Sequence, residues 1–430
     1  MKPFTLPDAL ARASAISFLL LAAALPWSVA PMSIALVACA ALTFLVWGVR
    51  REGWMRTPVD VPALVWLLAL VLASTFSLDP GQSFPRVAKG LLFLLVPVAA
   101  YHGRDERLAR RAVTVLLVSA VAAALFALGR FVLAGPHFPN RVKGAVGHPL
   151  TYGGQGMLFA SLATAIAIRC RGRWRAGALA ALVVLLPALA GTYTRSAWIG
   201  YVAALAVIVA FTRARWLCGV AGGVAALALV LPGVYRARAF SILDPQSPWN
   251  RERVHMWDAG LRMFRDHPWT GVGLQDLHSI YEVYKPPGAV EPAGHLHSVY
   301  VQVAATMGIV GLAALAFLVV GLMRAASRAF LEWRRTAARD RSPSGDFAAA
   351  ISLGVSAAFV GFLVSGLMEW NLGDEELLDL LCVLVGIAFG AVGWARHRAA
   401  RGGEELARIE RAPDQRDEAV EAGGVTSRLR

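Results

Sequence analysis

The chain has 430 residues, 57% of them hydrophobic, and a formal net charge of +14. A soluble domain would have to hide this apolar surface in its core, but here it is grouped in blocks of about 20 residues, the length that crosses a bilayer as a helix. The blocks do not alternate polar and apolar residues, which argues against a membrane β-barrel. We expect neither a disulfide framework nor a cysteine metal site, because all four cysteines fall in or beside the blocks: Cys39, Cys170, Cys218 and Cys382.

The sequence predicts an all-α polytopic membrane protein with about twelve transmembrane helices. In chain order the apolar blocks predict spans over residues 11–29, 32–49, 61–78, 86–101, 112–134, 150–168, 176–193, 197–212, 216–235, 298–323, 347–370 and 377–395. This division gives four segments: nine helices in residues 1–235, a long periplasmic loop at 236–297, three helices in 298–396, and a cytoplasmic tail at 397–430.

Basic residues predict the orientation of these helices. With the N-terminus inside, every short loop on the inner side carries at least two Lys or Arg residues, as cytoplasmic loops do. We therefore expect both termini in the cytoplasm. The other basic residues fall on the outer side or near the outer ends of spans: Arg86, Lys89, Arg130, Arg141, Lys143, Arg195, Arg236, Arg238, Arg251, Arg253, Arg262, Arg265 and Lys285.

These outer cations predict an anionic ligand on the periplasmic side, because cations are costly to translocate and need compensation there. The alternative is ion pairing with carboxylates of the same loop, which would absorb part of the charge. The candidate partners are Asp244, Glu252, Asp258, Asp266, Asp276, Glu282 and Glu291.

Within the long loop, "NRERVHMWDAGLRMFRDHP" (250–268) predicts an amphipathic helix. Its apolar residues Val254, Trp257, Leu261 and Phe264 recur at helical spacing, and arginines recur on another face. Such a helix fits the outer surface of the membrane. The simplest interpretation of the arginine face is contact with solvent or lipid headgroups.

Two further stretches place arginines where phosphate could bind. In "GTYTRSAWIG" (191–200), Arg195 lies at a tight outer turn, and its planar guanidinium suits bidentate contact with phosphate oxygens. In "NRVKGAVGHPLTYGG" (140–154), Arg141 and His148 occupy a glycine-containing loop. The alternative for Arg195 is a side chain that simply reaches the interface.

The stretch "GHLHSVYVQVAATMGIVGL" (294–312) places His295 and His297 at the start of a span, with Ser298 as a candidate cap. The positive potential of a helix N-terminus disfavours imidazolium, and a neutral ring can act as a general base. A plain interfacial pair with a capping role is the alternative. Zinc would need a third ligand, and only Glu291 or His278 is near in sequence, so we predict no metal.

This last stretch resembles the histidine-led motif of the O-antigen ligase/O-antigen polymerase family. His297, Tyr300, Gly308, Gly311 and Leu312 take the positions of that motif, although Ser298 stands where Asn is usual. "DHPWTGVGLQDL" (266–277) resembles the family's Pro-x-x-Gly-x-Gly segment, and "TYTRSAWIG" resembles its Ser/Thr-Arg segment.

The resemblance implies transfer of a glycan from undecaprenyl diphosphate to an acceptor hydroxyl at the periplasmic face of a Gram-negative inner membrane, with no cofactor, metal or nucleotide sugar. In the ligase the acceptor is lipid A–core; in relatives it is another glycan repeat or a protein hydroxyl. The expected partners are thus the lipid-linked donor, the acceptor and membrane lipids, but not nucleic acid.

The chemistry of such a transfer suggests the role of each residue. The acceptor hydroxyl must lose its proton, so we predict His297 as general base. The departing diphosphate needs cations, with Arg195 and Arg265 as first choices. Direct attack would invert the anomeric carbon. Further substrate-binding candidates are Arg251, Arg253, Arg141, His295 and His148.

A transporter or lipid flippase is the alternative from another class. It should carry ionisable groups near the middle of its spans, whereas this sequence keeps nearly all of them at the span ends.

Overall fold

The computed structural model describes residues 5–135, 139–219, 222–223, 226, 233–241, 244, 246–336 and 343–394. All regular structure in these residues is helical. The first part of the chain forms α1 (Leu6–Ala24), α2 (Val29–Arg50), α3 (Asp60–Thr75), α4 (Pro80–Ser83), the 3₁₀ segment η1 (Phe84–Leu94), α5 (Leu95–Gly103) and α6 (Glu106–Leu133).

The middle of the chain continues with α7 (Pro149–Arg169), α8 (Gly172–Gly191), α9 (Arg195–Arg213), η2 (Ala214–Trp216) and α11 (Gly233–Phe240). The helices of the loop and of the C-terminal part are α12 (Pro248–Asp266), α13 (His278–Tyr284), α14 (Val299–Thr336), α15 (Pro343–Ser365), η3 (Asn371–Gly373) and α16 (Glu375–Gly390).

Nine helical stretches of the described residues are long and apolar enough to cross a membrane. The expected count of about twelve is therefore not confirmed. Asp60–Thr75 is apolar but shorter, and α7 is long enough but not among the nine. Half of the residues in the predicted span at 216–235 lie outside the described part of the chain.

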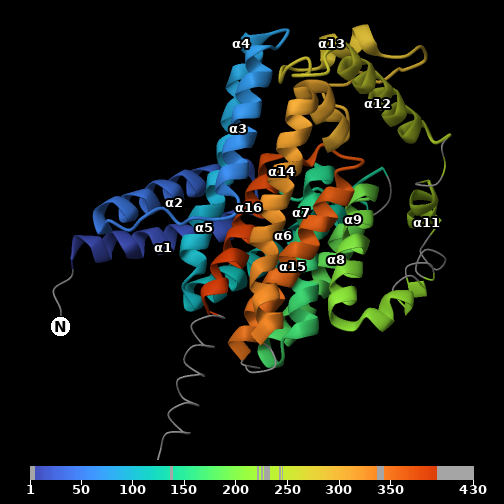
Figure 1. The fold of residues 1–430 in the computed structure, drawn as a ribbon. Coiled ribbons are helices and arrows are strands. Elements are labelled where there is room, and N and C mark those ends of the chain that lie inside the picture. Colours follow the sequence, from blue (N-terminus) through green and yellow to red (C-terminus); the bar gives the residue numbers. More distant parts are fainter. Residues whose placement is uncertain are drawn as a thin grey trace, which may run out of the picture.

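Two of the nine, α1 and α2, form a hairpin that runs at a large angle to α3 and α14 (Figure 1). Their candidacy as membrane spans therefore rests on length and composition, not on their direction relative to the other helices.

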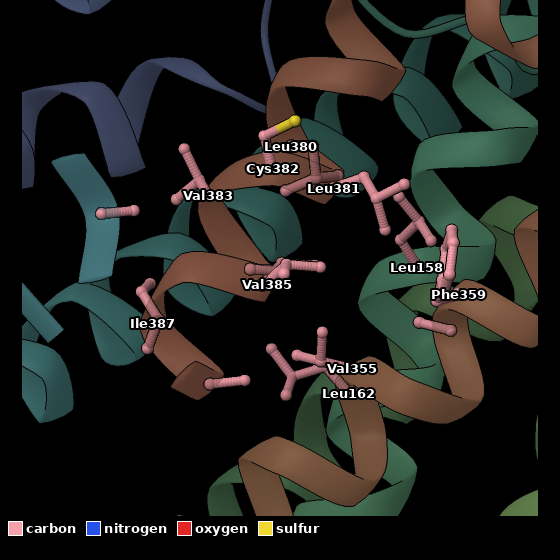
Figure 2. Close-up of a cluster of buried hydrophobic side chains, with 14 of the residues drawn as sticks. Leu158, Leu162, Val355, Phe359, Leu380, Leu381, Cys382, Val383, Val385 and Ile387 are labelled. Carbon is pink, nitrogen blue, oxygen red and sulfur yellow. The ribbon is translucent and has the colours of Figure 1, made fainter. Parts of the chain in front are cut away.

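The core lies where α7, α15 and α16 meet. Figure 2 shows Leu158 of α7, Phe359 of α15 and Leu381 of α16 among the buried side chains that gather there. Close packing depends on small residues, as is usual between helices in lipid. A Cβ on Gly200 of α9 would lie 2.7 Å from the carbonyl oxygen of Gly361 in α15, so these two backbones are nearly in contact.

A break in α14 shapes the end of the bundle where the histidines lie. Gly308 has φ 61°, which interrupts the helix about two and a half turns after its start at Val299. The segment 268–273 fills the break: Val272 N–H donates to Ala305 O (2.8 Å) and Ile309 N–H donates to Pro268 O (2.8 Å). A side chain on Gly271 would clash with the backbone at Thr306, so the Gly-x-Gly stretch is required for this docking.

The predicted amphipathic helix of the long loop is present as α12, which lies with α13 at the end of the bundle where α14 begins (Figure 1). The face that packs against the protein is different from the predicted apolar stripe. Met256, Ala259 and Met263 pack inward, while Val254 and Leu261 are exposed. Small and flexible side chains form the packed face because α12 approaches α14 closely there; a Cβ on Gly260 would clash with Val301.

Candidate functional site

His297 occupies a strained position just before α14. Its backbone has φ 45°, a left-handed conformation that is uncommon for a residue with a Cβ. The following residues are held firmly: Val299 N–H donates to Gly366 O (2.8 Å), and the Tyr300 hydroxyl donates to Leu363 O (2.9 Å). The start of α14 is therefore fixed against the end of α15, and this contact determines where the His297 ring lies.

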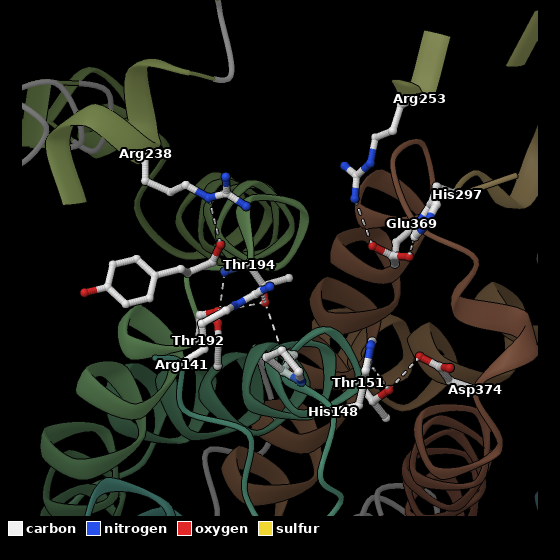
Figure 3. Close-up of polar contacts among 12 residues, drawn as sticks. Arg141, His148, Thr151, Thr192, Thr194, Arg238, Arg253, His297, Glu369 and Asp374 are labelled. Atoms are coloured by element: carbon white, nitrogen blue, oxygen red, sulfur yellow. Dashed lines mark hydrogen bonds and ion pairs between the residues drawn. The ribbon is translucent and has the colours of Figure 1, made fainter. Parts of the chain in front are cut away.

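A buried carboxylate connects His297 to an arginine. His297 Nδ1 lies 2.7 Å from Glu369 Oε1, and Arg253 Nη2 lies 3.2 Å from Glu369 Oε2. Figure 3 shows Arg253 and His297 approaching Glu369 from opposite sides. The Glu369 side chain is 7% exposed, so both contacts are largely shielded from solvent.

The charge of Glu369 determines which histidine nitrogen is free. Burial alone would raise the pKa of this carboxyl, but the hydrogen bond from His297 and the nearby positive charges outweigh burial and lower the pKa. An ionised Glu369 accepts a hydrogen bond from Nδ1–H of His297. In this tautomer Nε2 carries no proton, and its lone pair is available. A carboxylate that orients an imidazole and leaves its second nitrogen unprotonated is the arrangement expected of a histidine general base.

Arg195 is positioned by a three-residue turn between α8 and α9. Tyr193 in this turn has φ 50°, and Thr194 N–H donates to Thr192 Oγ1 (3.2 Å), which makes the reversal tight. Arg195 is only 5% exposed, and its Nη1 donates to the backbone oxygen of Ser241 at 3.0 Å. The predicted location of Arg195 at a tight turn is confirmed, and its side chain is buried.

Two further arginines hold the same turn. Arg141 Nε donates to Thr192 O (2.7 Å) and its Nη2 to Thr194 Oγ1 (3.0 Å). Arg238 Nε donates to Tyr193 O (3.4 Å) from the other side of the turn (Figure 3). The Arg238 guanidinium also lies over the Trp249 ring, 4.8 Å from its centroid.

These side chains meet in one cavity of about 240 Å³, which we call the arginine cavity. Four guanidinium groups and the His297 ring lie on its wall, with two carboxylates, Glu252 and Glu291, on the same wall. Its lining is Pro139, Arg141, Leu150, Arg195, Arg238, Trp249, Glu252, Arg253, Met256, Glu291 and His297.

The arginine cavity concentrates positive charge away from water. Burial, together with the charges of Arg141 and Arg253, lowers the pKa of Arg238 to about 10. Burial likewise lowers the pKa of Arg141, against the opposing influence of Glu369. Guanidinium groups remain charged at such values, so the cluster attracts an anion with several oxygens.

Other residues expected at the site lie outside the arginine cavity. Arg251 and Arg265 are on α12, but their side chains are exposed and neither lines the cavity. His148 precedes α7 and is also exposed; its Nδ1 lies 3.5 Å from Thr151 Oγ1. His295 stacks beside His297 with ring centroids 4.3 Å apart, and burial lowers its pKa to about 4.

Glu369 is the residue that the sequence reasoning missed. It lies in the predicted span 347–370, and an acidic residue inside an apolar segment is itself a signal for a functional site. The predicted neutral ring rests on the positive potential of the helix N-terminus alone. The Glu369 carboxylate is a second influence, and it favours a proton on His297 Nδ1. Arg238 was recognised as an outer cation but not chosen as a ligand.

His295, His297 and Glu369 together could hold a metal ion, since their ligand atoms lie within 4.8 Å of one another. The third ligand considered from sequence was different: His278 pairs with Asp276 instead (2.6 Å), and Glu291 lines the arginine cavity. Both oxygens of Glu369 already have partners in His297 and Arg253, and the neighbouring guanidinium opposes a second cation. The donor set therefore suits proton transfer better than metal binding.

Comparison with known protein families finds a match, which covers part of this site. Residues 180–316 match the family described as O-Antigen ligase. This stretch contains Arg195, Arg253 and His297 and ends within α14. No curated protein matches the chain.

Proposed function

We propose that this chain is a membrane glycosyltransferase of the O-antigen ligase/polymerase family, which joins an undecaprenyl diphosphate-linked glycan to the lipid A–core oligosaccharide of lipopolysaccharide; the match of residues 180–316 to the family described as O-Antigen ligase supports this proposal. The reaction takes place at the periplasmic face of the inner membrane. The observation that carries the proposal is the arginine cavity, where four guanidinium groups and one carboxylate-bound histidine share a wall.

The arginine cavity is the proposed binding site for the donor diphosphate. A sugar diphosphate is already a good leaving group, so departure needs stabilisation of negative charge more than protonation. Arg195 and Arg238 are held by backbone oxygens at 3.0 and 3.4 Å, so their charges are oriented before substrate arrives. Arg253 lies between this cavity and Glu369 and links the two halves of the site.

His297 is the proposed general base. As the acceptor hydroxyl oxygen bonds to the anomeric carbon of the donor glycan, the bond from that carbon to the phosphate oxygen breaks and its electron pair leaves with the diphosphate. The hydroxyl proton passes to His297 Nε2. Glu369, bound to Nδ1, stabilises the imidazolium that forms. A single displacement of this kind inverts the anomeric configuration.

The test is reconstitution of the reaction with purified protein, undecaprenyl diphosphate-linked glycan and lipopolysaccharide that lacks O-antigen. We expect a ladder of glycan-bearing lipopolysaccharide on a gel, with no added metal or nucleotide. His297→Ala should lower the rate by about 10²- to 10⁴-fold, the usual contribution of a general base. The control is His278→Ala, since His278 is exposed and pairs with Asp276 away from the arginine cavity.

Two outcomes would redirect the proposal. Full activity of His297→Ala would show that His297 is not the general base. Longer lipid-linked glycan, made equally well without lipopolysaccharide, would identify the chain as a polymerase of the same family.

A further inference from the structure

A second cavity of about 270 Å³ lies on the other side of the histidine pair, and we call it the Arg86 cavity. One part of its wall is polar and another part is apolar. The polar groups are Arg86, Lys89, Gln275, His295, Gln302 and Thr306. The apolar part includes Trp66 and Leu70 of α3 and Phe93 of η1. A ligand that fits this wall is therefore amphipathic.

The two cavities meet at the histidine pair. His297 lines the arginine cavity, His295 lines the Arg86 cavity, and their ring centroids are 4.3 Å apart. The linings of the two cavities are therefore adjacent at this point. A transferase needs its two substrates to meet at the base, so the acceptor hydroxyl must reach past His295 to the donor beside His297.

The cations of the Arg86 cavity are not equally compensated. Lys89 pairs with Glu375 (3.2 Å) and donates to Gly373 O (3.1 Å), so its charge is balanced. Arg86 donates to Leu274 O and its charge contributes to lowering the pKa of Asp276, but among the described residues it forms no direct ion pair with a carboxylate. One guanidinium with unused donors thus faces the cavity, and the natural complement is an anionic group.

We infer that the Arg86 cavity binds the acceptor and that Arg86 recognises an anionic group, phosphate or carboxylate, on the acceptor sugar near the hydroxyl that is glycosylated. This inference rests on the proposed function and adds a substrate requirement to it. The acceptor's sugar enters beside His295, and its lipid portion lies along the apolar side formed by α3 and η1. Donor and acceptor thus approach the histidine pair from opposite sides.

The test is a kinetic cycle with wild type and Arg86→Gln, each assayed with native acceptor, enzymatically dephosphorylated acceptor and carboxyl-reduced acceptor. We expect Arg86→Gln to raise the KM for native acceptor about 10-fold or more, since a hydrogen bond to a charged group is lost, while the KM for donor and kcat change less than about twofold. Removal of the recognised group from the acceptor should raise KM similarly in wild type and abolish the difference between the two proteins.

The two chemically altered acceptors distinguish phosphate from carboxylate as the anion. The matched control is Arg107→Gln, because Arg107 is an exposed arginine of α6 far along the bundle. If Arg86→Gln is poorly folded, Arg86→Lys retains the charge and should show a smaller rise in acceptor KM.

An equal effect of Arg86→Gln on all three acceptors, or an effect on donor KM instead, would overturn the inference. These outcomes differ from failure of the proposed function, in which wild type makes no transfer product with any acceptor.

Discussion

The two ends of α15 both gather arginines, but in opposite ways. Near Ser344, Arg107, Arg111 and Arg173 surround an apolar groove of about 920 Å³ between α6 and α8, and all three side chains are exposed. Near Glu369, Arg195 is 5% exposed and Arg253 is bound to a buried carboxylate. These three arginines of the groove rim differ from the arginines near Glu369 in burial and fixation, although the neighbouring Arg110 and Arg169 are partly buried and ion-paired.

This difference shows that the number of basic residues alone does not locate a functional site in a membrane protein. Exposed arginines at a helix end keep their hydration and cost little, whereas buried ones require fixed partners. At the Glu369 end those partners include the backbone oxygens of the Thr192–Thr194 turn, so the guanidinium groups are immobile and close together. Only the second arrangement is suited to stabilise charge that develops during a reaction.

The largest effect that tests the difference between the two ends of α15 is expected from Glu369→Gln. The amide preserves the volume but removes the negative charge that holds Nδ1–H of His297 and binds Arg253. We expect kcat to fall by about 10²- to 10³-fold with a much smaller change in the KM for donor, measured in the reconstituted transfer reaction.

Asp346→Asn serves as the control for Glu369→Gln. Asp346 is the carboxylate at the other end of α15 and pairs with Arg169 at 3.4 Å. If both substitutions reduced kcat equally, the catalytic distinction between the two ends would be wrong.

Arg195→Lys is expected to have the next largest effect. Lysine keeps the charge but loses the planar fork that can contact two phosphate oxygens, and we expect kcat/KM for donor to fall about 10-fold. Ser241→Ala is informative beside it, because this variant removes the hydroxyl that accepts from Arg195 (3.1 Å) and leaves the guanidinium in place. If Ser241→Ala reproduced the whole loss, Arg195 would act by holding the loop and not by binding donor.

The sequence was sufficient to predict the all-helical class, the long loop helix and the resemblance that the match of residues 180–316 supports, because hydropathy, helical periodicity and short motifs are local properties. Of its candidate site residues, four line the arginine cavity: Arg141, Arg195, Arg253 and His297. The choice of Arg265 depended on its place in a helical stripe, and the sequence alone could not show which face of α12 packs inward. Glu369 is 72 residues from His297 along the chain, and only the packing of α15 against α14 brings them together.

A smaller effect is expected from the buried carboxyl of Asp374, which accepts from Thr151 Oγ1 (3.1 Å) near the Glu369 end. Burial, together with the charge of Glu369, raises the pKa of Asp374 to about 7. The folded protein therefore binds a proton that the unfolded chain releases at lower pH, so stability falls as pH rises from about 4 to 7.

Asp374→Asn removes this proton equilibrium. The variant should flatten the decline of Tm with pH in that range by about 2–4 °C, measured by thermal unfolding in detergent. Asp346→Asn, which removes a carboxylate from the other end of α15, is the control for this substitution. An unchanged slope in Asp374→Asn would show that this carboxyl does not take up the proton.

The smallest effect is expected at the Ser344 end itself. The double substitution Arg107→Gln with Arg111→Gln removes two positive charges from the rim of the α6–α8 groove. Because both side chains are exposed and lie at the opposite end of α15 from His297, we expect kcat and both KM values to change less than about twofold in the reconstituted reaction. A loss comparable to that of Arg195→Lys would mean that charge acts on the donor across the length of the bundle. In that case the net positive charge, and not the fixed geometry around Glu369, would be the property that drives transfer.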